Sequence, residues 1–85
     1  MKPVRWTEHA LTELDKREMS REEAAPTLAI PNRIGPGNAP HLIYQRRYHD
    51  SLLNEEMLLR LLVEESEVEL VVMTLYKPSR LRKYD

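Results

Sequence analysis

The stretch MLLRLLVEESEVELVVMTLY, residues 57–76, decides the fold. Two apolar runs flank a short acidic turn at Glu65–Glu67. The second run is too rich in valine, and too long without a charge, to be anything but a buried strand. The first run has the propensity of a helix, but a short turn joins it to an evident strand. We therefore expect the two runs to pair as a β-hairpin.

Arg60 interrupts the first apolar run of this hairpin. A guanidinium among leucines cannot be buried without a partner at tolerable cost. It must therefore reach water, a carboxylate or a ligand phosphate. A salt bridge to Glu64 or Glu69, or exposure at a strand edge, is the structural alternative to a role in binding.

The length of the hairpin loop decides which residues share a face with Arg60. A three-residue loop sets Arg60 opposite Val72 and gives it the same face as Thr74 and Tyr76. A two-residue loop puts Met73 and Leu75 on that face instead. We favour the longer loop, because the shorter one places two glutamates directly opposite each other.

Strand and turn signals also precede the hairpin. HLIYQRRY, residues 41–48, is rich in β-branched and aromatic residues and favours a strand from about Leu42 to Tyr48. GPGN at residues 35–38 is a strong turn signal. HDSLLNEE, residues 49–56, has the composition of a connection between strands.

Helix signals occupy the first third of the chain. Thr7 is typical of an N-cap, and the helix that it begins runs to about Arg17. SREE, residues 20–23, is a capping box that begins a second helix. Pro26 lies too deep for the first turn, so it should kink or shorten this helix, and Pro31 ends it.

This order of elements predicts an α+β domain that covers residues 1–85. We expect two N-terminal helices packed on one face of a three- to four-stranded antiparallel sheet, with a short leading strand from KPVRW, residues 2–6. A chain of 85 residues suits one domain. The other face of the sheet stays open, and it is where we expect a ligand or a partner to bind.

Composition excludes several classes of function. The formal net charge of −1 gives no global attraction to nucleic acid or to an anionic membrane. The absence of cysteine excludes disulfides, thiolate catalysis and cysteine-ligated zinc. The charged start does not resemble a secretory signal, and no apolar run approaches the roughly 20 residues that span a bilayer. We expect no membrane association and a cytoplasmic location.

The sequence also indicates neither a metal nor a cofactor. His9, His41 and His49 lack the helical spacing of a preformed metal site. No glycine-rich phosphate loop is present, and no serine has the surroundings of a nucleophile elbow. His9 lies in a row with Glu13 and Arg17 at helical spacing, so it is either a half-exposed histidine that holds Glu13 or a proton shuttle.

A set of cations and phenols remains. Arg46 and Arg47 lie on the strand 42–48, and Arg60 lies on the hairpin. The end of the chain is dense in such groups: Tyr76, Lys77, Arg80, Arg82, Lys83 and Tyr84. A solvated tail that keeps the protein soluble is the structural alternative.

Three stretches of the chain resemble a known protein family. TEHALTELDKREMSREE (7–23), PNRI (31–34) and LRLLVEESEVELVVMTLYKPSRLRKY (59–84) look like a small bacterial family of domains of unknown function. Its pattern has a His-Ala pair on a first helix, an Arg at the helix end, a capping box, a strand that ends in Val-Thr-x-Tyr and a basic Lys-Tyr tail. The usual glycine after the helix-end Arg is Glu18 here.

That family is similar in layout to RelE, ParE and BrnT-like toxins. The resemblance implies a cytoplasmic, toxin-like RNA-binding domain or metal-independent endoribonuclease. Its implied partners are RNA, free or bound to ribosomes, and an antitoxin protein. A second copy of the chain is a further expected partner, because a domain of this size has a small core that a dimer would stabilise. A non-catalytic module that binds a protein or forms homo-oligomers is the alternative from another class.

Metal-independent RNA cleavage requires a base near the 2′-OH, cations around the phosphate and an acid for the leaving oxygen. We assign proton transfer to His9 or Tyr76, and contact with the phosphate to Arg17 and Arg60. The residues expected to bind the rest of the RNA are Arg46, Lys77, Arg80, Arg82, Lys83 and Tyr84.

Overall fold

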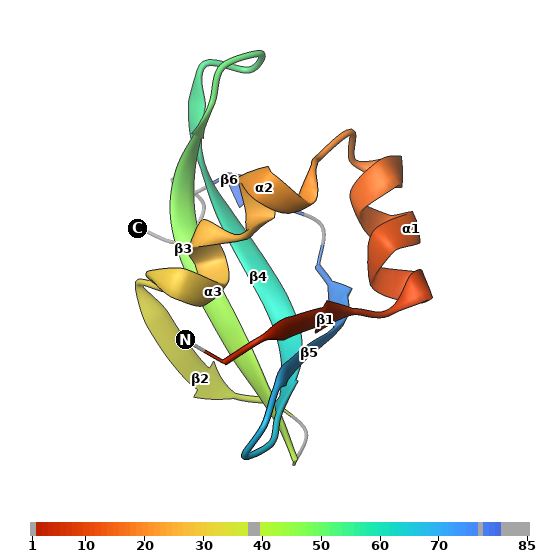
Figure 1. The fold of residues 1–85 in the computed structure, drawn as a ribbon. Helices are drawn as coiled ribbons and strands as arrows, with labels where there is room; N and C mark the ends of the chain where they lie inside the picture. The colour runs from red at the N-terminus through yellow and green to blue at the C-terminus, as the bar shows by residue number, and fades with distance from the viewer. Residues whose placement is uncertain (1, 38–39, 77, 81–85) are drawn as a thin grey trace.

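The hairpin of residues 57–76 forms the middle of a six-stranded sheet (Figure 1). The computed structural model of the protein describes residues 2–37, 40–76 and 78–80. The strands run in the order β1-β5-β4-β3-β2, and β6 also pairs with β4. They are β1 (Val4–Trp6), β2 (Arg33–Pro36), β3 (His41–Asp50), β4 (Glu55–Glu65), β5 (Leu70–Leu75) and β6 (Ser79–Arg80).

The two long strands β3 and β4 pair antiparallel over their whole lengths, with Gln45 directly opposite Arg60. β6 pairs with β4 at Met57 and Leu58, beyond the end of β5. One end of the β3–β4 hairpin projects past α2 (Figure 1). We predicted the segment 49–56 to be a connection, but only residues 51–54 form the turn; His49, Asp50, Glu55 and Glu56 belong to the strands, because cross-strand pairing extends further than expected.

A bulge in β5 decides which way the end of this strand faces. Val63 lies opposite Val72 and Leu62 lies opposite Thr74, so Met73 is an extra residue in the ladder. An unbroken register would turn Tyr76 toward the helices. The prediction that Arg60 faces Val72 is wrong. The prediction that Arg60 shares a face with Thr74 and Tyr76 is confirmed.

Thr7 connects the first strand to the first helix, α1 (Glu8–Lys16). Its hydroxyl accepts from the backbone N–H of Ala10 at 3.1 Å, which caps α1 as predicted. The same hydroxyl lies 3.0 Å from the carbonyl oxygen of Val72, so the start of the helix is tied to β5. The N–H of Thr7 also donates to that carbonyl at 3.2 Å.

The second predicted helix is broken by proline. The capping box of Ser20 and Glu23 is present and begins α2 (Arg21–Ala24). Pro26 then starts a separate helix, α3 (Pro26–Ala29). Proline lacks a backbone N–H and cannot continue a helix through its interior, so the segment forms two short helices in place of one.

The predicted fold class is wrong in three respects, although the domain is mixed α+β. The sheet has six strands where three or four were expected. It is not wholly antiparallel, because β1 pairs parallel to β5 with Val4 opposite Leu70. The helices are shorter than expected, and strand accounts for 47% of the structure. Strand β2 was not predicted, because it overlaps the GPGN stretch that indicates a turn; it pairs with β3.

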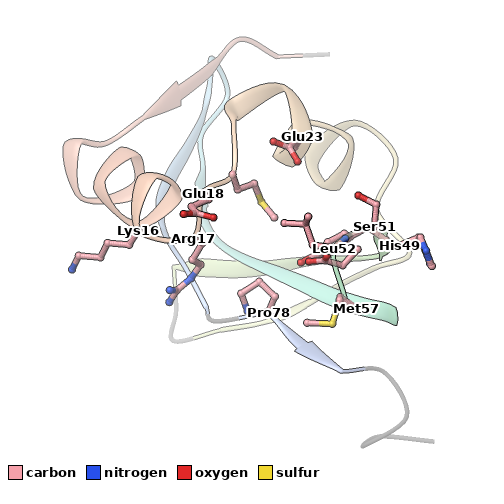
Figure 2. A pocket seen from close by; sticks show the side chains of 12 residues that line it. Lys16, Arg17, Glu18, Glu23, His49, Ser51, Leu52, Met57 and Pro78 are labelled. Carbon is pink, nitrogen blue, oxygen red and sulfur yellow. Dashed lines mark hydrogen bonds between the residues drawn. The ribbon is translucent and has the colours of Figure 1, made fainter. Parts of the chain in front are cut away.

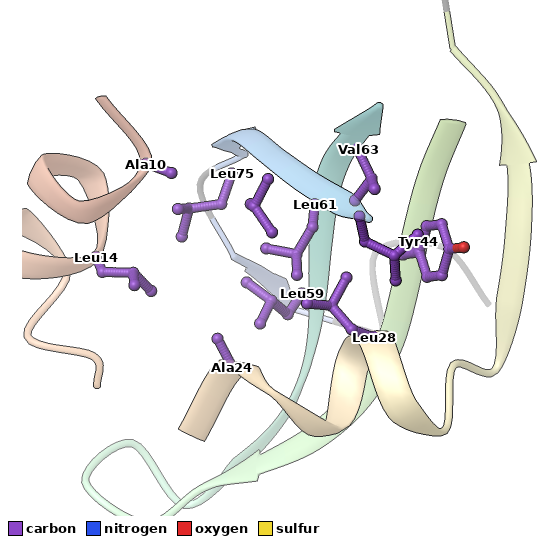
Figure 3. Close-up of a cluster of buried hydrophobic side chains, with 11 residues drawn as sticks. Ala10, Leu14, Ala24, Leu28, Tyr44, Leu59, Leu61, Val63 and Leu75 are labelled. Atoms are coloured by element: carbon purple, nitrogen blue, oxygen red, sulfur yellow. The ribbon is translucent and has the colours of Figure 1, made fainter. Parts of the chain in front are cut away.

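All three helices contribute to one core on the same side of the sheet (Figure 3). The side chains of β4 alternate, so that Met57, Leu59, Leu61 and Val63 are buried. The cluster of buried residues is Ala10, Leu14, Ala24, Leu28, Tyr44, Leu59, Leu61, Val63, Leu70, Val72 and Leu75. No described helix packs on the opposite face, which we call the open face. None of the described helices has the length and apolar content needed to cross a bilayer.

Candidate functional site

Four polar residues form one row across the middle of the open face. Arg33 of β2 lies opposite Gln45 of β3, and Gln45 lies opposite Arg60 of β4. Beyond β4, the backbone N–H of Tyr76 donates to the carbonyl of Arg60 at 3.0 Å. Residues directly opposite each other in a sheet point to the same face. We call Arg33, Gln45, Arg60 and Tyr76 the open-face row.

Arg60 has no carboxylate partner among the described residues. Its guanidinium carbon lies 5.3 Å from the centroid of the Tyr76 ring, which is a cation–π contact. Its Nε is buried and makes no hydrogen bond to the part of the chain that the structure describes. Glu69, one of the two partners considered for a salt bridge, pairs instead with Arg5 at 3.2 Å. The charge of Arg60 is therefore available to a ligand.

Two further arginines extend the positive charge on this face. Arg33 is exposed, and its Nε lies beside Gly35, where an added Cβ would be 3.8 Å away, at ordinary van der Waals distance. Arg47 is exposed and lies opposite Leu58. This pair is two residues along the strands from Gln45 and Arg60, on the same face. Neither arginine forms an ion pair with any described residue. Three guanidinium groups thus surround Gln45.

The acidic residues of the open face lie away from this centre. Glu56 and Glu64 stand on β4, on either side of Arg60 and opposite His49 and His41. Glu56 lies 3.2 Å from the imidazole of His49. The middle of the face is therefore cationic although the whole chain carries a net charge of −1.

Sequence reasoning missed Arg33 and Gln45 as site residues and selected Arg46 in place of Arg47. Arg46 lies opposite Leu59 on the helical side. Its guanidinium donates to the carbonyl of Ile30 at 2.6 Å, and it thereby holds the end of α3. The alternation of Gln45 and Arg47 along β3 was the available signal, but choosing between the two faces required the register with β4.

The predicted residues of the tail divide into two groups. Arg80 lies opposite Met57, on the helical side, and its Nε is 2.8 Å from the carboxylate of Glu55. Its charge is thus compensated within the chain. The other predicted tail residues lie outside the described residues: Lys77, Arg82, Lys83 and Tyr84.

His9 lies on α1 and Arg17 is the C-cap of that helix, so both come from the helical side of the sheet. The His9 imidazole lies 3.8 Å from the carboxylate of Glu13, and the Arg17 guanidinium lies 3.5 Å from it. No hydrogen bond, ion pair or ring contact between described residues joins either one to Arg60 or Tyr76. The fold therefore brings the four predicted catalytic residues together as two pairs, not as one group.

Arg17 instead lines a cleft of about 440 Å³ between the end of α1, α2 and the tip of the β3–β4 hairpin (Figure 2). The cleft also contains carboxylates, including Glu18, Glu23 and Asp50. The pKa of Tyr48 in its wall is raised, first by burial and then by Asp50 and Glu23. Lys16 and Arg17 line the same cleft, so its lining is mixed in charge. The middle of the open face, where arginines gather away from the carboxylates of that face, is the better site for a polyanion.

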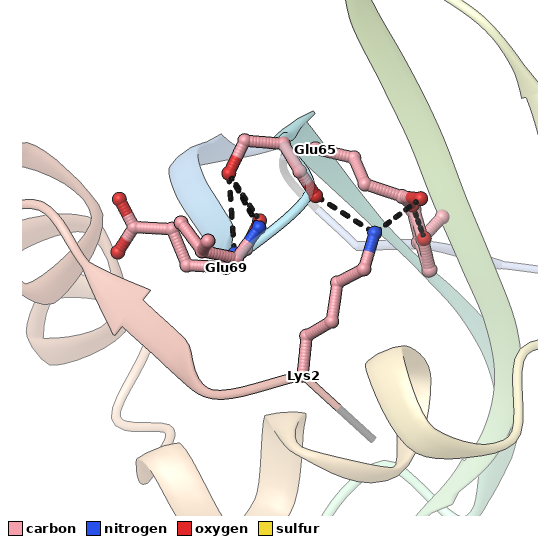
Figure 4. Close-up of polar contacts among 6 residues, drawn as sticks. Lys2, Glu65 and Glu69 are labelled. Atoms are coloured by element: carbon pink, nitrogen blue, oxygen red, sulfur yellow. Dashed lines mark hydrogen bonds and ion pairs between the residues drawn. The ribbon is translucent and has the colours of Figure 1, made fainter.

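Charged residues near the β4–β5 turn are paired with one another (Figure 4). The Lys2 ammonium lies 3.1 Å from the Glu65 carboxylate and donates to the carbonyl of Ser66 at 2.7 Å. The Tyr44 hydroxyl donates to Glu65 at 2.8 Å. Burial, followed by this hydrogen bond, raises the pKa of Tyr44 to about 12. This cluster secures the start of the chain to the sheet.

Within the described residues, no group of three or more histidine and carboxylate side chains is arranged to hold a metal ion. Searches against protein-family models, curated proteins and solved structures give no match to this chain. The resemblance to the toxin-like family therefore stays a prediction, and function must be argued from the open face.

Proposed function

We propose that this protein binds RNA through the open face of its sheet. The observation that carries the proposal is Arg60, a half-buried arginine in the middle of the face that has no carboxylate partner among the described residues and lies over the ring of Tyr76. A guanidinium held in this way can donate two parallel hydrogen bonds to a phosphate. The aromatic ring beside it can stack on a base.

The residues near Arg60 favour a polyanion as the ligand over a single phosphate. Arg33 and Arg60 lie two strands apart, a separation of about 10 Å at the spacing of neighbouring strands. Arg47 lies between them along β3. Three guanidinium groups without an ion pair among the described residues, at these positions, suit successive phosphates of one strand. The flanking side chains of Ile43 and Leu58 are half-buried.

Metal-independent cleavage of the bound RNA is the second part of the proposal, and Tyr76 favours it. In this reaction the 2′-oxygen attacks phosphorus, the bond to the 5′-oxygen breaks, and protons leave the 2′-OH and reach the 5′-oxygen. Arg60 would stabilise the charge that develops on the phosphate oxygens. The Tyr76 hydroxyl, on a side chain that is 38% exposed beside Arg60, would transfer a proton.

A toxin of this kind would act in the cytoplasm on free or ribosome-bound RNA. An antitoxin would inhibit it by placing carboxylates over the arginines of the open face. A protein-binding or homo-oligomerising module is the competing function. Two leucines at the tip of the β3–β4 hairpin favour it, because Leu52 is 90% and Leu53 is 51% exposed.

The experiment is RNA binding by the purified protein, measured by fluorescence anisotropy over a series of salt concentrations. Arg60→Ala is expected to weaken binding by roughly tenfold or more and to reduce the salt slope by about one. Arg21→Ala, which removes an exposed arginine on the helical side, is the matched control and should bind as the parent does. Circular dichroism verifies that each variant folds.

Cleavage is tested in parallel with total RNA, with and without ribosomes, in the presence of a chelator. Binding without cleavage would retain the first part of the proposal and reject the second. Equal binding by the parent and Arg60→Ala, or an affinity that does not change with salt, would reject RNA binding at this face.

A further inference from the structure

We propose that Gln45 selects adenine in the RNA that the open face binds. This inference rests on the proposed function and adds base selectivity to it. Gln45 lies at the centre of the open-face row, directly opposite Arg33 on β2 and Arg60 on β4. Its side-chain amide makes no hydrogen bond to any described residue, so both its donor and its acceptor are available to a ligand.

The groups around Gln45 differ from it in what they can recognise. Arg33, Arg47 and Arg60 carry charge and bind phosphate without regard to sequence. A glutamine amide carries no charge and offers one donor and one acceptor side by side. Adenine and cytosine both present the complementary pair, an exocyclic amino group next to a ring nitrogen. Of the two only adenine is a purine, and a bidentate contact from a glutamine to its amino group and ring nitrogen discriminates it from guanine.

The geometry of the sheet places a base within reach of this amide. Side chains directly opposite in neighbouring strands have Cβ atoms about 5 Å apart, which is shorter than a purine. A purine that stacks on the guanidinium plane of Arg60 would therefore extend its edge over Gln45. Tyr76, the member of the row on the other side of Arg60, holds that guanidinium in a cation–π contact at 5.3 Å.

The bases of single-stranded RNA are accessible in this way, because they are not paired with a second strand. Ile43 and Leu58 flank the row along the strands and offer half-buried apolar surface beside the base. The arginines of the open face thus contact phosphates, and Gln45 discriminates between bases.

The test compares uridine hexamers that carry one central adenosine, cytidine or guanosine with the all-uridine hexamer, by fluorescence anisotropy at one salt concentration. The parent is expected to bind the adenosine hexamer roughly tenfold more tightly than the all-uridine hexamer. Gln45→Met keeps the length of the side chain and removes the amide. It should retain binding to the all-uridine hexamer and lose the preference for adenosine.

Thr74→Val is the matched control, because it removes a polar group from the same face at a position opposite Leu62 and away from the row. It should keep the preference. A parent that binds all four hexamers equally, or a preference that survives in Gln45→Met, would reject the role of Gln45 and leave RNA binding standing. A parent that binds none of the hexamers would instead reject the proposed function itself.

Discussion

The guanidinium carbon of Arg60 lies 5.3 Å from the centre of the Tyr76 ring, across the gap between β4 and the segment that follows β5. This contact depends on Met73, the extra residue that shifts the register of β5. Without the bulge, Leu75 would lie opposite Arg60 and Tyr76 would point toward the core. A single inserted residue thus creates an arginine–tyrosine pair on the open face.

The first prediction concerns the ring of Tyr76. Tyr76→Leu is expected to weaken RNA binding by roughly tenfold, because stacking of a base on an aromatic ring contributes about 1–3 kcal/mol. Tyr76→Phe keeps the ring, so it should bind almost as the parent does and lose cleavage if the hydroxyl transfers a proton. Anisotropy and RNA cleavage assays measure the two effects. Tyr48→Phe, on the helical side, serves as the control, and unimpaired binding by Tyr76→Leu would contradict the prediction.

The second prediction concerns the end of α1, where Glu18 adopts a left-handed conformation with φ of 53°. Met19 donates to the carbonyl of Leu14 and Glu18 to that of Asp15, both at 3.0 Å, which is the Schellman motif that usually has glycine at this position. Glu18→Gly removes the strain of a side chain at positive φ and should stabilise the fold by about 1 kcal/mol.

Thermal unfolding measures this effect. Asp15→Gly, which introduces glycine inside α1 where φ is negative, should have the opposite sign and lower the melting temperature. A decrease in stability on Glu18→Gly would show that the Glu18 side chain makes a favourable contribution greater than the strain.

The third prediction concerns pH. The pKa of the Glu65 carboxyl is held below its usual range, first by the hydrogen bond from Tyr44 and then by Lys2. Because the pKa is lower in the folded than in the unfolded protein, the stability that this carboxylate contributes is present above its ordinary pKa of 4.5. That stability is lost as the pH falls through the folded pKa.

Urea unfolding from neutral to acidic pH tests the prediction. Tyr44→Phe removes the main cause of the shift, so its stability should depend less steeply on pH at the acidic end than that of the parent. Glu67→Gln, an exposed position in the same turn, should leave the pH dependence nearly unchanged. If the free energy of unfolding fell equally with pH in the parent and in Tyr44→Phe, the hydrogen bond from Tyr44 would not be the main cause of the lowered pKa of Glu65.

The fourth prediction compares Leu61 of β4 with Leu52 at the tip of the β3–β4 hairpin. Leu61 is fully buried in the core, whereas Leu52 is 90% exposed. Leu61→Ala should destabilise the protein by about 2–5 kcal/mol, because it leaves a cavity among residues that cannot close around it. Leu52→Ala should change stability by less than about 0.5 kcal/mol. Denaturant unfolding measures both, and a large loss on Leu52→Ala would show that the hairpin tip is packed in solution.

Local signals in the sequence predicted the elements whose contacts are local. The cap of Thr7, the capping box of Ser20 and Glu23, and the break at Pro26 all depend on residues within one helical turn, and each is present. The hairpin of residues 57–76 was predictable because its two strands are joined by a short turn. The leading strand was expected as well, but its parallel partner was not.

Elements defined by distant partners were missed. β2 has only four residues and contains Gly35 and Pro36, so its own sequence resembles a turn. It becomes a strand because β3 supplies the hydrogen bonds. β6 has two residues and exists only as a partner of β4.

The residues of the open face also divide into those that local sequence predicts and those that only strand pairing places there. The sequence by itself determined that the unpaired charge of Arg60 had to find water, a carboxylate or a ligand, since a guanidinium amid leucines is costly to bury. Only the tertiary structure decided that Arg47, not Arg46, shares its face, and that Arg33 and Gln45 complete the row. Side chains alternate along every strand, so which of them meet depends on the register between strands. That register is set by pairings between residues far apart in the chain.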